Sequence, residues 1–133
     1  MSLSETDPGP ASIPAGEPLC TLGDLAPGRS KGFRVEGEET PVLVFLVRPN
    51  NARDDEVYGY VNQCAHRSTP LDWVEGEFLD AESKTIVCAT HGAVFRIEDG
   101  VCIEGPCPGK SLQAVSLEVR GGRIYVSTAP RYR

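Results

Sequence analysis

Only two histidines occur in this chain of 133 residues, and each lies close to a cysteine. His66 belongs to the pattern Cys64-x-His66, and His91 belongs to Cys88-x-x-His91. Thiolate and imidazole groups are ligands for zinc, copper and iron–sulfur centres. The 21 residues between His66 and Cys88 can hold a strand, a turn and a returning strand. The chain is therefore constrained to a fold in which two loops converge on one metal centre.

Short apolar or alternating segments between turn residues predict an all-β fold. The segments expected to be strands are 41–47, 57–61, 85–88, 94–97, 117–120 and 123–126. Gly121-Gly122 lies between the last two and is a strong signal for a two-residue hairpin turn. No window keeps a 3.6-residue period, so only short helical turns are expected, near 22–25 and after Pro70. The pattern favours a compact antiparallel β domain with both Cys/His loops at one end.

The charge balance is acidic, with 19 Asp and Glu against 13 Lys and Arg, and a formal net charge of -6. A negative field repels phosphate backbones, so we expect no nucleic-acid partner. The acidic clusters at 36–39, 54–56 and 75–82 are typical of a solvated surface, or of a surface that steers a basic protein partner. No apolar segment approaches the roughly 20 residues of a membrane span, so no membrane anchor is expected.

The length corresponds to one domain. Residues 1–16 are rich in Pro, Gly, Ser and Ala and are expected to form a flexible tail, with a single domain over 17–133. The first residues lack the basic and apolar regions of a secretory signal, which predicts a cytoplasmic protein. In that compartment, clustered cysteines usually indicate metal binding or catalysis rather than disulfides.

Two metal chemistries compete for the Cys/His pairs. A zinc site with two Cys and two His usually takes ligands of one kind from each short segment. Here each loop supplies one ligand of each kind. A [2Fe–2S] cluster with two Cys on one iron and two His on the other fits that alternation, because each loop can bind both irons.

The pattern Cys64-x-His66 … Cys88-x-x-His91-Gly92 resembles the signature of the Rieske iron–sulfur family. The resemblance runs from about residue 17 to residue 126. It includes Asn62, Pro70-Leu71, Phe95, Gly105-Pro106-Cys107-Pro108 in the place of the family's proline loop, and the hairpin at 117–126.

The resemblance implies a Rieske-like antiparallel β-sandwich or barrel. A small cluster-binding subdomain at about 62–108 would consist of two ligand loops and the proline loop. One [2Fe–2S] cluster per chain would be held by Cys64, His66, Cys88 and His91.

The resemblance also implies a function in one-electron transfer. Both irons would be fully ligated, and the 42 residues after His91 contain no histidine for a second iron, so the chain is expected to be no enzyme by itself. It is similar to ferredoxins that carry electrons from a reductase to a terminal oxygenase. The alternatives are a small subunit of a larger redox complex, as in nitrite reductases with a large partner subunit, and a zinc-binding or redox-sensing module.

Ala93 and Phe95 stand two and four residues after His91, where respiratory relatives have Ser and Tyr hydroxyls near the cluster. Hydrogen bonds to sulfur stabilise the reduced, more negative cluster. Their absence here predicts a reduction potential at the low end of the Rieske range, around -150 mV.

The other candidates are assigned smaller roles. Cys102 and Cys107 are expected to be small buried side chains, with a local disulfide or a redox-active thiol as alternatives, and Cys20 to be a strand residue without chemistry. Packing is predicted for Trp73 and Phe78, with partner contacts as the alternative. An apolar collar around the cluster is predicted for Pro70, Leu71, Pro106 and Pro108, with a docking role as the alternative.

Overall fold

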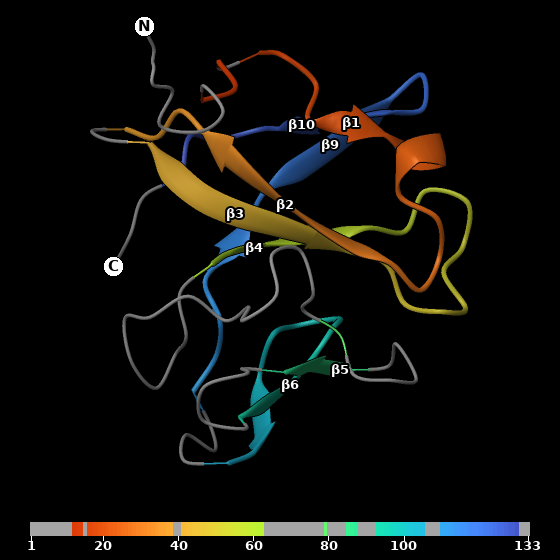
Figure 1. Cartoon of the computed structure of the whole chain (residues 1–133), viewed down its shortest axis with the longest axis vertical. Coiled ribbons are helices and arrows are strands. Elements are labelled where there is room, and N and C mark those ends of the chain that lie inside the picture. The colour runs from red at the N-terminus through yellow and green to blue at the C-terminus, as the bar shows by residue number, and fades with distance from the viewer. Residues whose placement is uncertain are drawn as a thin grey trace, which may run out of the picture.

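The computed structural model describes residues 12–14, 16–38, 41–62, 79, 85–87, 93–105 and 110–130. The regular structure within these ranges is β-strand apart from one 3-10 turn, so the all-β prediction is confirmed. The strands form three antiparallel sheets, which follow one another from top to bottom in Figure 1. Within the described ranges, no helix has the length and hydropathy that crossing a membrane requires.

The central sheet has the strand order β2-β3-β4-β8. Its strands are β2 (Ser30–Val35), β3 (Val42–Val47), β4 (Tyr58–Val61) and β8 (Ala114–Val115). β3 is a run of β-branched, leucine and phenylalanine side chains, which suits a strand with a neighbour on either edge and a covered surface on both faces. The sequence predicted β3 and β4 within one residue of their observed starts.

β3 contributes to two separate hydrophobic cores because successive side chains point to opposite faces. Val42, Val44 and Leu46 belong to one cluster, which we call the outer core. Phe45 and Val47 belong to the other, which we call the inner core. The outer core contains Leu19, Leu25, Val35, Val42, Val44, Leu46, Val61, Val115 and Ile124. The inner core contains Phe45, Val47, Tyr60, Ile86, Ala93, Phe95, Ile97, Cys102 and Leu112.

The outer sheet covers the outer core and has the order β1-β10-β9. Its strands are β1 (Cys20–Thr21), β9 (Leu117–Arg120) and β10 (Arg123–Val126). The predicted hairpin turn is confirmed, since Gly121 and Gly122 join β9 to β10 with φ of 58° and 78°, in the left-handed region that favours glycine.

The predicted helical turn at 22–25 is observed as a 3-10 turn at Leu22–Asp24. It has a capping box, in which the Thr21 hydroxyl accepts from the Asp24 N–H and the Asp24 carboxylate accepts from the Thr21 N–H, both at 3.1 Å. The second predicted turn, after Pro70, lies outside the described residues.

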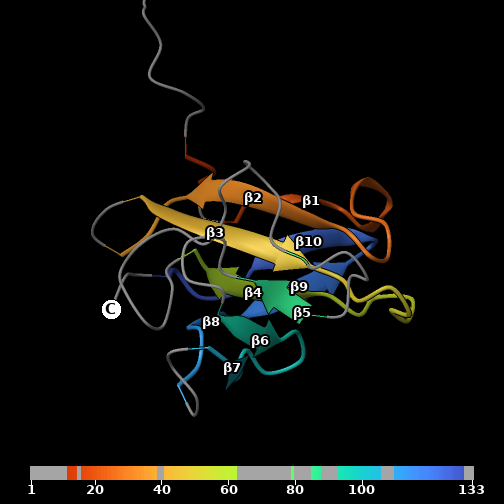
Figure 2. The same cartoon turned by 60° about the horizontal axis from the view of Figure 1, so that its bottom comes forward.

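The small sheet covers the inner core and has the order β5-β6-β7. Its strands are β5 (Thr85–Val87), β6 (Val94–Arg96) and β7 (Cys102–Glu104). Figure 2 brings this sheet to the front, beside β4 of the central sheet. The hydroxyl of Tyr60 on β4 donates to the carbonyl oxygen of Ile97, at 2.5 Å, and so joins the two sheets through the inner core.

Arg48 organises the connection between β3 and β4. Its side chain is buried, and its guanidinium donates to four backbone carbonyl oxygens, those of Leu25, Arg53, Asp54 and Glu56, at 2.7–3.1 Å. A buried cation needs such partners to offset the loss of hydration. The bond to the Leu25 carbonyl fixes this connection against the 3-10 turn. The connection leads into the start of β4, whereas Asn62 follows the other end of that strand.

The bond between Tyr60 and Ile97 predicts a pH-dependent contribution to stability. Replacing Tyr60 by Phe is expected to lower the free energy of unfolding by about 1 to 2 kcal/mol, because the Ile97 carbonyl loses a buried donor. Burial raises the pKa of Tyr60 above its usual value of 10.0. The contribution of the neutral hydroxyl is therefore complete below about pH 10 and is lost as the pH rises through the raised value.

Urea unfolding at pH 8 and pH 11 measures this effect, with Tyr125→Phe in the outer sheet as the matched control. The stability of the parent protein should fall between the two pH values, and that of Tyr60→Phe should fall less. An equal fall in both proteins would contradict the assignment.

Candidate metal centre

The four expected ligands, Cys64, His66, Cys88 and His91, lie outside the described residues. The same holds for Cys107 and for the expected packing and collar residues Pro70, Leu71, Trp73, Phe78, Pro106 and Pro108. Their roles stay predictions. The structure does describe the strand ends from which the two ligand loops and the proline loop begin.

The second Cys/His pair lies in the connection of a β-hairpin. β5 and β6 pair in antiparallel register, and Val87 opposite Val94 is the last pair before residues 88–93. Cys88 therefore follows the last residue of β5, and His91 precedes β6 by three residues. The sequence prediction that a strand leads into this pair is confirmed.

The first Cys/His pair begins where β4 leaves the central sheet. The N–H of Asn62 donates to the carbonyl oxygen of Leu43 at 2.8 Å, and the Asn62 side chain is buried. Cys64 follows two residues later. Further along the chain, Leu79 forms an antiparallel bridge with Ile86 in β5. The residues that flank the first Cys/His pair are thus attached to two sheets, Asn62 to the central sheet and Leu79 to the small sheet.

The proline loop begins beside the second ligand loop. Glu104, the last residue of β7, pairs with Val94, the first residue of β6. The next residue, Gly105, lies against Ala93 so closely that a β-carbon there would be 2.7 Å from the Ala93 Cα. After the loop, the carbonyl oxygen of Lys110 accepts from the Cys102 N–H at 2.7 Å. The proline loop is therefore held at both of its ends by β7 and its neighbours.

The bases of the second ligand loop and the proline loop lie together at one end of the small sheet, and the chain that follows the first Cys/His pair reaches this sheet through Leu79. Leu79, which follows the first Cys/His pair in the chain, forms a bridge with Ile86 of β5. Val87 and Val94 are the last pair before the second loop. The proline loop starts on the same end of the sheet, because Val94 pairs with Glu104. This convergence, together with the two thiolates and two imidazoles that the sequence supplies, fits a [2Fe–2S] cluster at this end.

Among the residues that the structure describes at the second loop base, Ala93 and Phe95 offer no hydroxyl group. Ala93 and Phe95 are both fully buried in the inner core. The nearby Tyr60 hydroxyl is directed to the Ile97 carbonyl instead. Ala93 and Phe95 therefore have no hydroxyl group to donate to a nearby sulfur, and the prediction of a low reduction potential rests on that lack.

Two of the other cysteines lie within the described ranges. Cys20 is a half-buried residue of β1, as expected, and burial raises the pKa of its thiol. Cys102 on β7 is buried, and its Sγ lies 3.3 Å from the Glu104 carbonyl oxygen, to which it donates. Both are thiols rather than disulfides. The expectation of a small buried side chain at Cys102 is confirmed.

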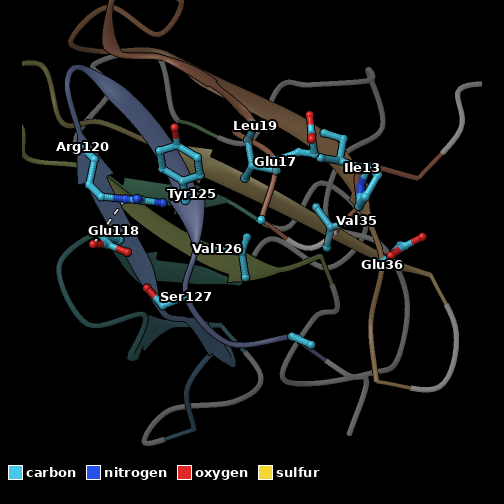
Figure 3. Close-up of a pocket in the computed structure, with 13 residues that line it drawn as sticks. Ile13, Glu17, Leu19, Val35, Glu36, Glu118, Arg120, Tyr125, Val126 and Ser127 are labelled. Atoms are coloured by element: carbon cyan, nitrogen blue, oxygen red, sulfur yellow. Dashed lines mark ion pairs between the residues drawn. The ribbon is translucent and has the colours of Figure 1, made fainter.

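Sequence reasoning missed a cavity of about 300 Å³ beside the outer sheet (Figure 3). The Arg120 guanidinium stacks over the Tyr125 ring at 4.2 Å and pairs with Glu118 at 3.4 Å along its wall. Its lining residues come from the N-terminal segment, the β2 end and β9–β10, and none belongs to the small sheet. The cavity is therefore separate from the candidate metal centre.

The fold defines a class of small all-β proteins with three antiparallel sheets, in which strands of the small sheet lead into the second Cys/His pair and into the proline segment. Residues 17–126 match the Rieske [2Fe-2S] domain family. The chain belongs to this family, whose cofactor is one [2Fe–2S] cluster per domain, and it is an electron carrier rather than a catalyst.

Among curated proteins, the chain is similar to the ferredoxin component of the alkene monooxygenase system of Xanthobacter autotrophicus (strain ATCC BAA-1158 / Py2). The two are 31% identical over 113 residues, which cover 84% of this chain and 80% of that protein.

Among solved structures, the chain is similar to the ferredoxin of carbazole 1,9a-dioxygenase from Nocardioides aromaticivorans IC177. The identity is 30% and the TM-score 0.64, with 86% of this chain and 98% of that chain covered. A structure described as the complex of reduced oxygenase and oxidized ferredoxin in carbazole 1,9a-dioxygenase shares the fold. Its TM-score is 0.62 at 22% identity, over 88% of this chain and 96% of that one.

Proposed function

We propose that this chain is a diffusible Rieske ferredoxin that carries single electrons from a reductase to a terminal oxygenase. The observation that carries the proposal is that the second ligand loop and the proline loop begin at one end of the small sheet, which also receives the chain from the first Cys/His pair at Leu79, in a chain of the Rieske family. The relatives with 30% identity or more are named as a ferredoxin component of a monooxygenase system and as the ferredoxin of a dioxygenase.

Cys64 and Cys88 would hold one iron of the cluster, and His66 and His91 the other. When bound, the cluster takes up and releases one electron. These four residues would complete the ligation of the cluster and would leave no position for a substrate. That arrangement suits transfer of an electron between proteins, and the chemistry on the organic substrate takes place in the partner oxygenase.

The proposed domain organisation is a tail at 1–16 and a single Rieske domain at 17–133, with the cluster-binding part at about 62–108. The compartment that we propose is the cytoplasm, with the protein soluble there. Cys20 and Cys102, the two cysteines within the described ranges, are thiols, as is usual in a reducing compartment. The acidic surface would favour partners with a basic docking face.

The first test is an EPR spectrum of the dithionite-reduced protein, with iron and sulfide analysis of the same anaerobic sample. A signal with the low average g of a His-ligated diiron cluster, at two irons per chain, is expected. Stoichiometric zinc without iron would overturn the proposal.

The second test distinguishes a free carrier from a subunit of a larger complex. The cluster-loaded protein, expressed in a host that contains its natural neighbours, is purified under mild conditions and its mass is measured by light scattering. Mass at the value of a single chain is expected, with rapid reduction by a reductase taken from a Rieske oxygenase system. Stable co-purification with a large redox subunit would contradict the diffusible form.

A further inference from the structure

The end of β7 contains a backbone contact that only glycine permits. Gly105 has a φ of 104°, and a β-carbon at this position would lie 2.7 Å from the Ala93 Cα and 3.3 Å from its N and Cβ. Carbon atoms in favourable contact are about 3.5 to 4.0 Å apart. The nearest atom is backbone, so no side-chain rotation could make room for the added group.

This contact joins the base of one ligand loop to the base of the proline loop. Ala93 is fully buried and follows His91 by two residues, and Gly105 immediately precedes Pro106. The contact between Gly105 and Ala93 therefore lies where a small shift of the backbone changes the separation between these two loop bases.

The pairing of β6 with β7 brings the two residues to this separation. Val94 is opposite Glu104 and Phe95 is opposite Cys102, so β7 has one additional residue, Ile103, between two adjacent residues of β6. Such a bulge bends its strand. The Ile103 side chain is 43% exposed, and the strand end lies on Ala93.

We propose that Gly105 is a positioning residue for the iron–sulfur cluster. Its missing side chain lets the end of β7 lie on Ala93, and this contact fixes the backbone that follows His91. The inference rests on the proposed function, in which His91 binds iron. Metal–ligand distances in proteins hold to within about 0.2 Å, so a displacement large enough to admit a methyl group at Gly105 would disturb the ligation.

The chain offers two matched controls for Gly105→Ala. Gly100 also has a positive φ, of 72°, and a β-carbon there would lie 2.7 Å from Tyr60 Cε1. It is at the opposite end of the β6–β7 hairpin, so Gly100→Ala tests general damage to the small sheet. Gly121 in the β9–β10 turn has a φ of 58° and nothing within 4 Å, so Gly121→Ala tests backbone strain alone.

The experiment measures the rate of iron release to a chelator and the EPR g values of the reduced protein, with thermal unfolding alongside. Replacing groups that orient metal ligands typically weakens metal binding about tenfold to 100-fold. We expect Gly105→Ala to release iron about tenfold faster than the parent protein and to show shifted g values. Both controls should keep the parent g values and release iron at close to the parent rate, whatever stability they lose.

A second variant keeps the inference testable if Gly105→Ala does not fold. Ala93→Gly removes the methyl group that faces Gly105 and loosens the same contact without a clash, so it should also release iron faster than Gly100→Ala. A parent protein without iron would sink the proposed function and this inference together. A parent protein with its cluster, and a contact variant that behaves like Gly100→Ala, would overturn the inference alone.

Discussion

Replacing Cys88 by Ser is expected to abolish binding of the cluster, so that iron falls from two per chain to almost none and the EPR signal of the reduced protein disappears. Cys88 follows the last residue of β5 and is one of only two thiolates proposed to hold the first iron. A hydroxyl is a poor replacement because iron–sulfur clusters are held by deprotonated thiols. The same loss is expected when His91 is replaced by Ala.

Cys20→Ala is the matched control, since Cys20 is a half-buried residue of β1 in the outer sheet. It should retain two irons and the parent spectrum. The four variants at Cys64, His66, Cys88 and His91, each compared with Cys20→Ala, would identify the ligand set directly. A full complement of iron and sulfide in Cys88→Ser would exclude that residue as a ligand.

Introducing hydroxyl groups at Ala93 and Phe95 should raise the reduction potential of the cluster. The double variant Ala93→Ser, Phe95→Tyr supplies two donors at fully buried positions beside the second loop. A hydrogen bond to a charged group is worth about 1.5 to 3 kcal/mol, and a tenfold change in a one-electron equilibrium corresponds to about 59 mV. Because the reduced cluster is more negative, we expect the midpoint potential to rise by on the order of 100 mV.

Protein-film voltammetry measures this change, from a parent value expected at about -150 mV. Tyr60→Phe is a useful control because it also changes one inner-core hydroxyl, but one that donates to the Ile97 carbonyl. Its potential should stay close to that of the parent. A parent midpoint well above zero, or a double variant with no increase, would show that the potential is set by other groups.

The sequence predicted the strands whose own residues carry a clear local pattern. β3 is an uninterrupted apolar run, and the β9–β10 hairpin has Gly121-Gly122 between two alternating segments. β2 was missed because Gly32 and charged residues interrupt its apolar pattern. Such residues are tolerated there because β2 is an edge strand of the central sheet with a mostly exposed surface. The short apolar runs at 57–61 and 85–88 also predicted, correctly, that strands run toward both Cys/His loops.

Other features depend on partners that are distant in sequence and have no local signal. Cys20 pairs with Ile124, and Tyr60 bonds to Ile97, 37 residues away. The close approach of Gly105 to Ala93 depends on the bulge between β6 and β7, which is a property of two strands together. Glycine before a proline is too common a pattern to predict such a contact.

The side chains of β3 alternate between two cores, so the outer sheet and the small sheet cover opposite faces of the central sheet. The protein can therefore be fixed to an electrode by the outer sheet with the small sheet facing away. Face-to-face sheets are spaced by about 10 Å, so a tag placed in the β9–β10 turn would lie roughly 20 Å behind the small sheet. Molecules attached there would all present the small sheet to the solution, where a partner protein can reach it. Attachment at the outer sheet would therefore give an oriented layer suited to following electron delivery to an oxygenase.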